Sequence, residues 1–256
     1  MDFEKRAQAT YKHLIRTCNT RNEKMVSKEY PEVQKFITKN EMLISRIALI
    51  LGNIPPTDVA DESIRDLLGD TFDSLFTAKE IIYKGYLGTP FVLLRRAWET
   101  VSLMTLFMLH PVKSQDWRKG KEIKQSDIRK AHEKHPSGGD VKWQKEMHTY
   151  FAKYAHPNSS IIPYRGLGAG SEYTMGNFAK PEPMLTMPNL IRLIQLWACL
   201  RHILVRRYGQ QLFVTDPKLK KALEKISDAQ ASKLNVDLQA KYDKLVREYK
   251  IKGKFK

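Results

Sequence analysis

Cysteine is nearly absent from this chain, which has two, Cys18 and Cys199, in 256 residues. The two lie far apart in segments of helical character, one near the end of the first predicted helix and one beside Trp197. Disulfide frameworks use several closely spaced cysteines in small secreted domains. The cysteines therefore predict two packing residues in a reducing compartment, and they exclude a disulfide-stabilised scaffold.

Long apolar runs are also missing. The N-terminus, MDFEKRAQATYKH, carries acidic residues from the start and lacks the apolar core of a secretory signal. The longest apolar stretches, 101–109 and 47–51, are shorter and more interrupted than the roughly 20 residues that cross a bilayer. The sequence predicts a cytoplasmic protein without a transmembrane segment.

Standard catalytic and cofactor motifs are missing as well. The glycines of 166–170 have neither the lysine nor the strand–helix frame of a phosphate-binding loop. The segment His132–His135 lacks the spacing of a zinc-protease motif, and together with His148 it has no cysteine or well-placed carboxylate to complete a zinc site. A di-iron centre needs Glu-x-x-His pairs on facing helices, which are not found. We expect no metal and no cofactor, and a conventional hydrolase is disfavoured.

Acidic residues are few relative to basic ones: 28 Asp and Glu stand against 44 Lys and Arg, a net charge of +16. Such an excess predicts a polyanionic partner, with nucleic acid first, RNA before DNA, and an anionic membrane surface second. A plain solubilising charge is the alternative. The excess is concentrated in 201–256, and the candidate nucleic-acid-binding residues are Arg206, Arg207, Lys218, Lys220, Lys221, Lys252 and Lys254.

What the chain does have is helical periodicity, and strand signals are scarce. It predicts an all-α antiparallel helical bundle with a basic excursion (111–139) holding one short helix, a long Gly/Pro/Tyr loop (157–187) and a C-terminal helical appendage. We place a bundle domain at 1–210 and the basic appendage at 211–256. Caps and apolar spacing predict helices at 2–19, 31–53, 58–85, 89–110, 140–155, from Pro188 to about 209, after Asp216-Pro217, and at about 230–250.

The helix predicted over 89–110, TPFVLLRRAWETVSLMTLFMLH, is the most informative segment. Thr89 is a good N-cap and Pro90 suits the first helical position. The helix is apolar on nearly every side, yet it carries Arg95, Arg96 and Glu99. Because an unpaired buried charge is costly, these residues predict either a buried polar site or an Arg95–Glu99 pair that orients the bundle.

GTPFVLLRRAWET together with the later FAKYAHPNS resembles an uncharacterised family of bacterial all-helical domains, which is similar in turn to the HEPN superfamily. On this resemblance Arg95 and Glu99 occupy the first motif and His156 the second. Nuclease-active HEPN domains carry an arginine followed a few residues later by a histidine, a spacing that Arg129 and His135 match. Lys130 departs from the Asn, Asp or His that usually follows the arginine.

The resemblance implies a homodimer and a role in toxin–antitoxin or phage-defence systems, with a partner protein such as an antitoxin. If Arg95, Glu99 and His156 meet, a guanidinium and an imidazole can bind a phosphate and move a proton without a metal. One hypothesis is therefore a nucleic-acid-interacting protein that acts as a metal-independent endoribonuclease. The other is a non-enzymatic helical scaffold in which the Arg–Glu–His network is structural and the basic tail docks on a polyanion or partner.

Overall fold

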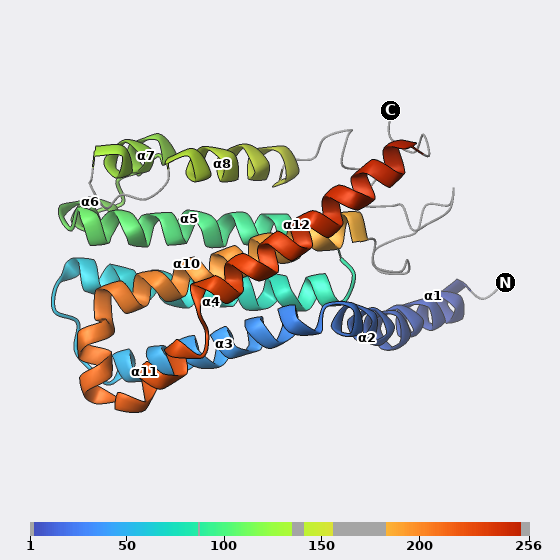
Figure 1. Cartoon of the computed structure of the whole chain (residues 1–256), viewed down its shortest axis with the longest axis horizontal. Helices are drawn as coiled ribbons and strands as arrows, with labels where there is room; N and C mark the ends of the chain where they lie inside the picture. The colour runs from blue at the N-terminus through green and yellow to red at the C-terminus, as the bar shows by residue number, and fades with distance from the viewer. Residues whose placement is uncertain (1–2, 87, 135–140, 156–182, 252–256) are drawn as a thin grey trace.

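The computed structural model describes residues 3–86, 88–134, 141–155 and 183–251 (Figure 1). All regular structure in these ranges is helical, which confirms the predicted all-α bundle. The elements are α1 Phe3–Lys12, the π-helix η1 His13–Cys18, α2 Asn19–Glu29, α3 Pro31–Gly52, α4 Val59–Tyr83, α5 Pro90–Leu109, α6 Val112–Arg118, α7 Gln125–Lys134, α8 Val141–Ala155, α10 Pro183–Thr215, α11 Pro217–Glu224 and α12 Asp228–Ile251.

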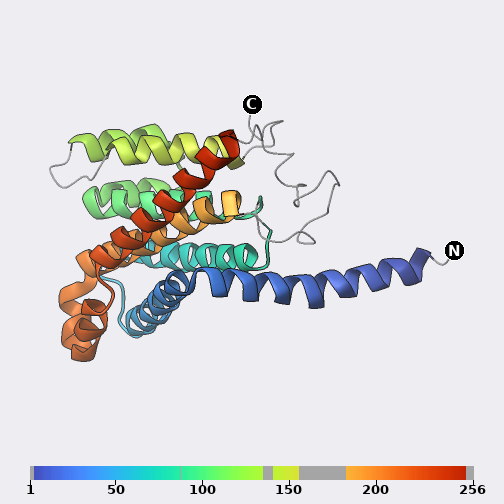
Figure 2. The same cartoon turned by 45° about the vertical axis from the view of Figure 1, so that its right-hand side comes forward.

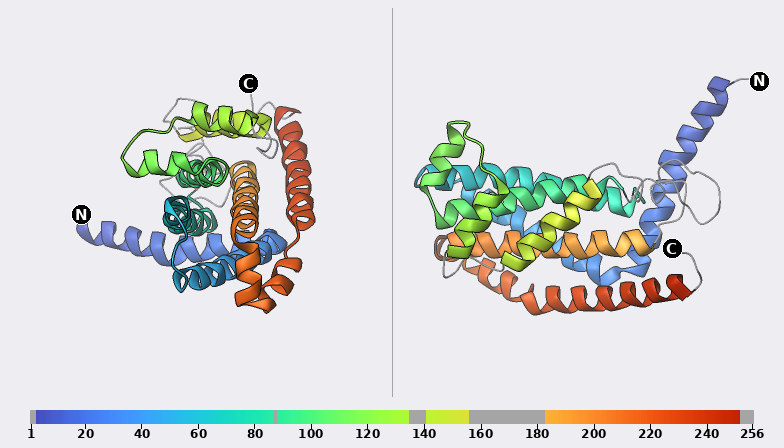
Figure 3. Two further views of the ribbon diagram at one scale, coloured as in Figure 1. Left: turned by 90° about the vertical axis from the view of Figure 1, so that its left-hand side faces the viewer. Right: turned by 90° about the horizontal axis from the view of Figure 1, so that it is seen from above.

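The centre of the bundle is made by α4, α5 and α10, which are seen almost end-on in the left view of Figure 3. α3 and α12 pack against α10, and α7 and α8 pack against α5. The largest side chains of the core are aromatic, and Trp98, Trp197, Phe36 and Phe107 are fully buried. Burying such side chains is the main source of stability in a fold of this kind, because each removes a large apolar area from water.

The boundaries of α3, α4 and α5 agree with the sequence prediction to within two residues. Asp58 caps α4, since its side chain accepts a hydrogen bond from the amide of Asp61 at 2.7 Å. Pro90 opens α5 as expected, but the side chain of Thr89 makes no capping hydrogen bond, so that part of the prediction was wrong. Thr89 is itself in the helical region of backbone conformation, where its hydroxyl does not reach the first free amides.

α10 is longer than predicted at both ends. It begins at Pro183, within the predicted loop, and continues past Gly209 to Thr215. Pro188 lies in the second turn, where it removes one hydrogen bond, while the burial of Met184 and Met187 favours the helix. Gly209 costs roughly 1 kcal/mol inside a helix. The complete burial of Leu212 one turn later offsets that cost.

The basic excursion contains two helices, α6 and α7, where the sequence predicted one. Both pack on the bundle: the rings of Trp117 and Phe107 are 5.6 Å apart, and Ile128 is fully buried. In the sequence these two apolar residues stand among many lysines. In the structure Trp117 anchors α6 to the bundle and Ile128 anchors α7. Most of the predicted loop over 157–187 lies outside the described residues.

The N-terminal elements α1, η1 and α2 form an almost continuous helix whose α1 end points away from the bundle (Figure 2). Its root is fixed by α2, which contacts α3 and α4. There the side-chain amide of Asn22 donates a hydrogen bond to the carbonyl of Lys84 at 3.1 Å. Gly85 follows with φ +87°, and a Cβ on it would lie 2.5 Å from the Asn22 Nδ2. Only glycine fits this turn, for conformational and for steric reasons.

Cys18 and Cys199 are both free, and Cys18 is buried. Among the described helices, none combines the length and the apolar character that crossing a membrane requires. The described part of the predicted appendage consists of the last residues of α10 (211–215), α11 and α12, and α12 packs along α10. Whether 211–256 is a domain of its own stays a prediction.

Candidate functional site

Arg95 and Glu99 form the i,i+4 ion pair that the sequence predicts, with 2.9 Å between Arg95 Nε and Glu99 Oε1. Their side chains are 32% and 37% exposed. The expectation of a buried polar site in α5 was therefore wrong for these two residues. The pair lies at the surface of the bundle, where solvent reaches both charges and a ligand can reach them too.

The reason lies in how α5 is covered. α4, α10, α8, α7 and α6 all contact it, and they bury Leu94, Ala97, Trp98 and Val101. One strip remains open to solvent, and it begins at the half-exposed Val92. A helix that is apolar on most sides can therefore still have a wet face, because single apolar residues are common on protein surfaces.

Arg96 and the residue one turn later, Thr100, form a second polar strip on α5. The first is exposed and the second is buried. Arg96 is 64% exposed and binds Asp70 of α4 with two nitrogens, Nε at 3.0 Å and one terminal nitrogen at 2.6 Å. Thr100 is buried, and its hydroxyl lies 2.7 Å from that of Thr71 on α4. Both contacts join α5 to α4, so this strip has a structural role.

The predicted histidine partners cannot be placed beside the pair. His156 and His135 lie outside the described residues, so the meeting of Arg95, Glu99 and His156 stays a prediction. Arg129 of the second motif lies partly buried on α7, and Lys130 is exposed. In the described parts of the chain, no three His, Cys, Asp or Glu side chains come together as a metal site would need.

A different histidine contacts Trp98, the residue before Glu99. The exposed His148 of α8 packs edge-on against Trp98, with 6.2 Å between the ring centres, and Trp98 directly precedes Glu99. The same face of α8 is held to α5 by Phe151 on Trp98 and by Tyr150 on Phe91. The sequence indicated this aromatic face, but it considered His148 only as a zinc ligand.

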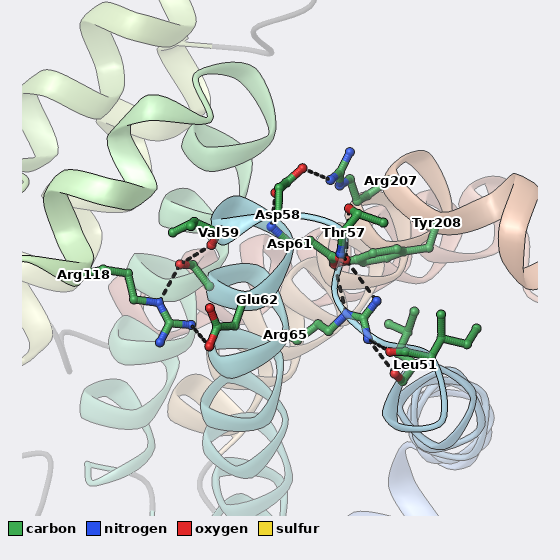
Figure 4. Close-up of polar contacts among 12 residues, drawn as sticks. Leu51, Thr57, Asp58, Val59, Asp61, Glu62, Arg65, Arg118, Arg207 and Tyr208 are labelled. Atoms are coloured by element: carbon green, nitrogen blue, oxygen red, sulfur yellow. Dashed lines mark hydrogen bonds and ion pairs between the residues drawn. The ribbon is translucent and has the colours of Figure 1, made fainter.

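The most connected polar group of the molecule is elsewhere, at the turn between α3 and α4 (Figure 4). The buried carboxylate of Asp61 accepts hydrogen bonds from Arg65 Nε at 2.9 Å, from the Tyr208 hydroxyl at 2.6 Å and from the Thr57 amide at 2.8 Å. Arg65 in turn donates to the carbonyls of Leu51 and Ile54. Leu51 lies in the last turn of α3 and Ile54 lies just after the helix, so Arg65 ties α3 to α4 and Tyr208 ties both to α10.

The ionisation of this cluster follows from its contacts. Burial acts to raise the pKa of Asp61, but the hydrogen bonds from Arg65, Tyr208 and Thr57 outweigh it, so the pKa is lowered. Burial raises the pKa of Tyr208, and its bond to the Asp61 carboxylate raises it further. Asp61 is thus held charged and Tyr208 neutral. Every strong contact of the carboxylate is made from within the protein, which suits a structural role.

Two smaller networks extend the same pattern. Arg118 donates to the hydroxyl of Ser63 at 2.9 Å and to the carboxylate of Asp66 at 2.5 Å, which fixes α6 to α4. It also lies 3.7 Å from the carboxylate of Glu62 (Figure 4). In the core, Arg201 of α10 donates to the side-chain oxygen of Asn40 at 2.9 Å and pairs with Asp228 at the start of α12. Each joins helices that are distant in sequence.

Sequence reasoning missed these networks. The one available signal for the Asp61 cluster was local: a cap at Asp58, an acid three residues later and an arginine at i+4. Tyr208 is 147 residues from Asp61, and Arg201 is 161 residues from Asn40. No spacing rule connects residues so far apart.

The candidate nucleic-acid-binding residues are spread over three places. Lys218, Lys220 and Lys221 are exposed on α11. Arg206 is exposed on α10, whereas its neighbour Arg207 faces Asp58 at 3.3 Å (Figure 4). The remaining two, Lys252 and Lys254, lie outside the described residues.

No protein-family model, no curated protein and no solved structure matches this chain. The resemblance to HEPN domains therefore stays a prediction that depends on the two sequence motifs.

Proposed function

We propose that the protein binds a polyanion, and RNA in particular, through α11. The observation that carries this proposal is a group of four exposed lysines, Lys218, Lys220, Lys221 and the following Lys225, none of which forms an ion pair with any described residue. α11 holds them in place because Leu219 is fully buried against the bundle. Lysine ammonium groups displayed in this way suit phosphate contacts.

The carboxylates of the bundle do not neutralise these lysines. Asp216 precedes α11, but it accepts from Arg46 at 2.6 Å and from the amide of Lys218 at 3.1 Å. On α4, Asp66 and Asp70 are engaged by Arg118 and Arg96. These three acidic side chains are thus engaged by arginines, and the four lysines of α11 stay exposed.

The test is salt-dependent RNA binding by the full chain. Replacing Lys218, Lys220 and Lys221 with glutamine is expected to weaken binding of a labelled single-stranded RNA. It should also lower the slope of log affinity against log salt by about 0.7 for each phosphate contact that is lost. Fluorescence anisotropy over a salt series measures both quantities.

The matched control replaces three other exposed lysines, Lys113, Lys119 and Lys124, which lie in and after α6. It removes the same charge from a different surface. A loss of binding as large as that of the α11 variant would show that only total charge matters and would overturn the proposal.

A second candidate function, metal-independent RNA cleavage, is favoured by one observation. The Arg95–Glu99 pair is open to solvent, and His148 offers an imidazole on the neighbouring helix α8. A guanidinium can hold the phosphate, and an imidazole can take the proton from the 2′-hydroxyl as its oxygen attacks the phosphorus. The P–O5′ bond then breaks, and the imidazolium gives the proton to the leaving 5′-oxygen. The expected products carry a 2′,3′-cyclic phosphate and a free 5′-hydroxyl.

Turnover separates the two hypotheses. Total RNA is incubated with the protein in EDTA, beside Arg95→Ala, His148→Ala and His156→Ala variants whose helicity is checked by circular dichroism. Cleavage that is lost in folded variants supports the enzyme, and the two histidine variants show which imidazole acts. RNA binding without cleavage in the wild type supports the non-enzymatic scaffold.

A further inference from the structure

A groove with a volume of about 1020 Å³ lies between α3 and α4, beside the loop that joins them. Ile44 and Leu49 of α3 line it, together with Leu68 and Phe72 of α4 and the loop residues that follow α3. Most of this lining is apolar. Leu49 is 71% exposed, so the apolar surface is open to solvent. A hollow of this size and character is typical of sites that bind small molecules.

The groove has one charge that the protein itself does not compensate. Its two charged lining residues are Arg65 and Asp73. Arg65 pairs with Asp61 at 2.9 Å, so its charge is neutralised from within. Asp73 is exposed, and its carboxylate forms no ion pair and no hydrogen bond with any described side chain. A ligand in this groove therefore meets an apolar surface with a single unpartnered negative charge.

An aromatic pair lies next to this carboxylate. Asp73 directly follows Phe72, whose ring is stacked on that of Phe76 with 6.2 Å between the ring centres. Phe76 is 42% exposed. The ammonium of Lys79 lies 4.4 Å from the centre of the Phe76 ring, so the pair already contacts one alkylammonium group of the chain itself. A carboxylate beside aromatic rings is a combination that recognises organic cations.

We propose that the α3–α4 groove binds a small amphiphilic amine, an apolar molecule that carries one ammonium group. The apolar body lies against Leu49, Leu68 and Phe72, and the ammonium pairs with Asp73. A neutral ligand of the same shape would leave the carboxylate without a partner, and an anionic one would place a like charge beside it. The single carboxylate therefore gives the groove its preference for a cation.

The length of the groove favours a small molecule over a helical peptide. The α3 residues that line it, from Ile44 to Gly52, span about 12 Å at 1.5 Å per residue, which is little more than two helical turns. A peptide helix of that length is marginal in water and would lose much of its binding energy to ordering. A compact amphiphile has a smaller cost of this kind.

Calorimetric titration of the full chain tests the proposal, with decylamine as the probe and decanol as its neutral analogue. Both are used below the concentration at which they aggregate, at low salt and pH 7, where the amine is protonated. The wild type is expected to bind one decylamine per chain, about three- to fivefold more tightly than decanol. That ratio is the magnitude of an ion pair that stays partly exposed.

Two variants separate the apolar contact from the charge contact. Gly69→Leu fills the groove: a Cβ on Gly69 meets nothing within 4 Å and leucine favours the helix, so folding is preserved while both probes should bind at least tenfold more weakly. Asp73→Asn should bind decylamine as weakly as decanol and leave decanol unaffected. Asp127→Asn, at an exposed carboxylate of α7, removes the same charge elsewhere and should bind both probes like the wild type.

Several results would overturn the proposal: no binding of decylamine by the wild type, binding that survives Gly69→Leu, and equal affinities for decylamine and decanol. Equal losses in Asp73→Asn and Asp127→Asn would show that only net charge matters, and would also overturn it. Sedimentation velocity tests a second copy of the chain as the occupant. A wild-type dimer that Gly69→Leu abolishes would assign the groove to self-association instead of a ligand.

Discussion

Among the described residues, two arginine–carboxylate pairs share the i,i+4 spacing but have opposite surroundings. Asp61–Arg65 on α4 and Arg95–Glu99 on α5 both place the arginine Nε 2.9 Å from a carboxylate oxygen. In the first pair the aspartate is 1% exposed and the arginine 15%. In the second pair both side chains are about one-third exposed. Because both pairs have the same spacing in the sequence, their difference in burial must come from the other groups of the protein that contact each pair.

Further donors make the difference. Asp61 also accepts hydrogen bonds from Tyr208 and Thr57, and Arg65 also donates to two carbonyls. Among the described residues, Glu99 accepts from Arg95 alone. A charged pair can be buried at tolerable cost only when its remaining hydrogen-bonding positions are filled. The Asp61 pair therefore serves stability, and the Arg95–Glu99 pair stays partly open to solvent.

Removing Asp61 should have the largest effect. Asp61→Ala leaves the Arg65 charge and the Tyr208 hydroxyl without their partner, so we expect the free energy of unfolding to fall by about 3 to 5 kcal/mol. Urea unfolding followed by circular dichroism measures it. Glu99→Ala is the matched control, and an equal loss in both variants would show that burial does not distinguish the two pairs.

Tyr208→Phe removes one donor to an ionised carboxylate and keeps the shape of the ring. We expect a loss of about 1.5 to 2 kcal/mol, because Arg65 and Thr57 still hold Asp61. The same unfolding experiment applies. A variant as stable as the wild type would show that the tyrosine hydroxyl adds nothing to the cluster.

The pH dependence of stability should show a smaller change that belongs to Asp61. Its pKa in the folded protein is lowered from 3.8, so its charged form contributes stability at higher pH that is lost as pH falls below 3.8 and through the lowered value. The stability difference between wild type and Asp61→Asn should therefore be constant from pH 5 to 7 and shrink in acid. A difference that grows in acid would contradict the assignment.

The Arg95–Glu99 pair should contribute least. Its exposure to solvent predicts a coupling energy of about 0.5 kcal/mol or less between Arg95→Ala and Glu99→Ala in a double-mutant cycle. High salt should reduce it further. A coupling above about 2 kcal/mol would place this pair in the same class as the Asp61 pair.

Much of the fold could be predicted because its signals are local. Pro31, Pro90 and Asp58 mark helix starts, and apolar spacing marks the faces that pack. The errors also have local causes. Helix α10 runs through Pro188 and Gly209 because tertiary burial outweighs the preference of single residues.

The candidate site was predicted less well, because burial depends on which helices cover which face. The residues of α5 do not by themselves show that Glu99 and Val92 stay partly exposed in the folded bundle. The lysines of α11 were predicted from composition alone, since surface charge needs no long-range partner. The Asp61 cluster could not be predicted in this way, because the three helices that it joins, α3, α4 and α10, meet only in the folded chain.

The contact between Asn22 and Gly85 has a consequence for how this chain can evolve. A Cβ at position 85 would overlap the side-chain amide of Asn22, and the turn needs φ +87°. The residue at position 85 is therefore constrained by the residue at position 22. A descendant without glycine at position 85 needs a smaller side chain at position 22 and a different turn conformation. Without both changes it loses the contact that holds α2 against the bundle. Divergent copies of this chain are therefore expected to keep Gly85 wherever asparagine is kept at position 22.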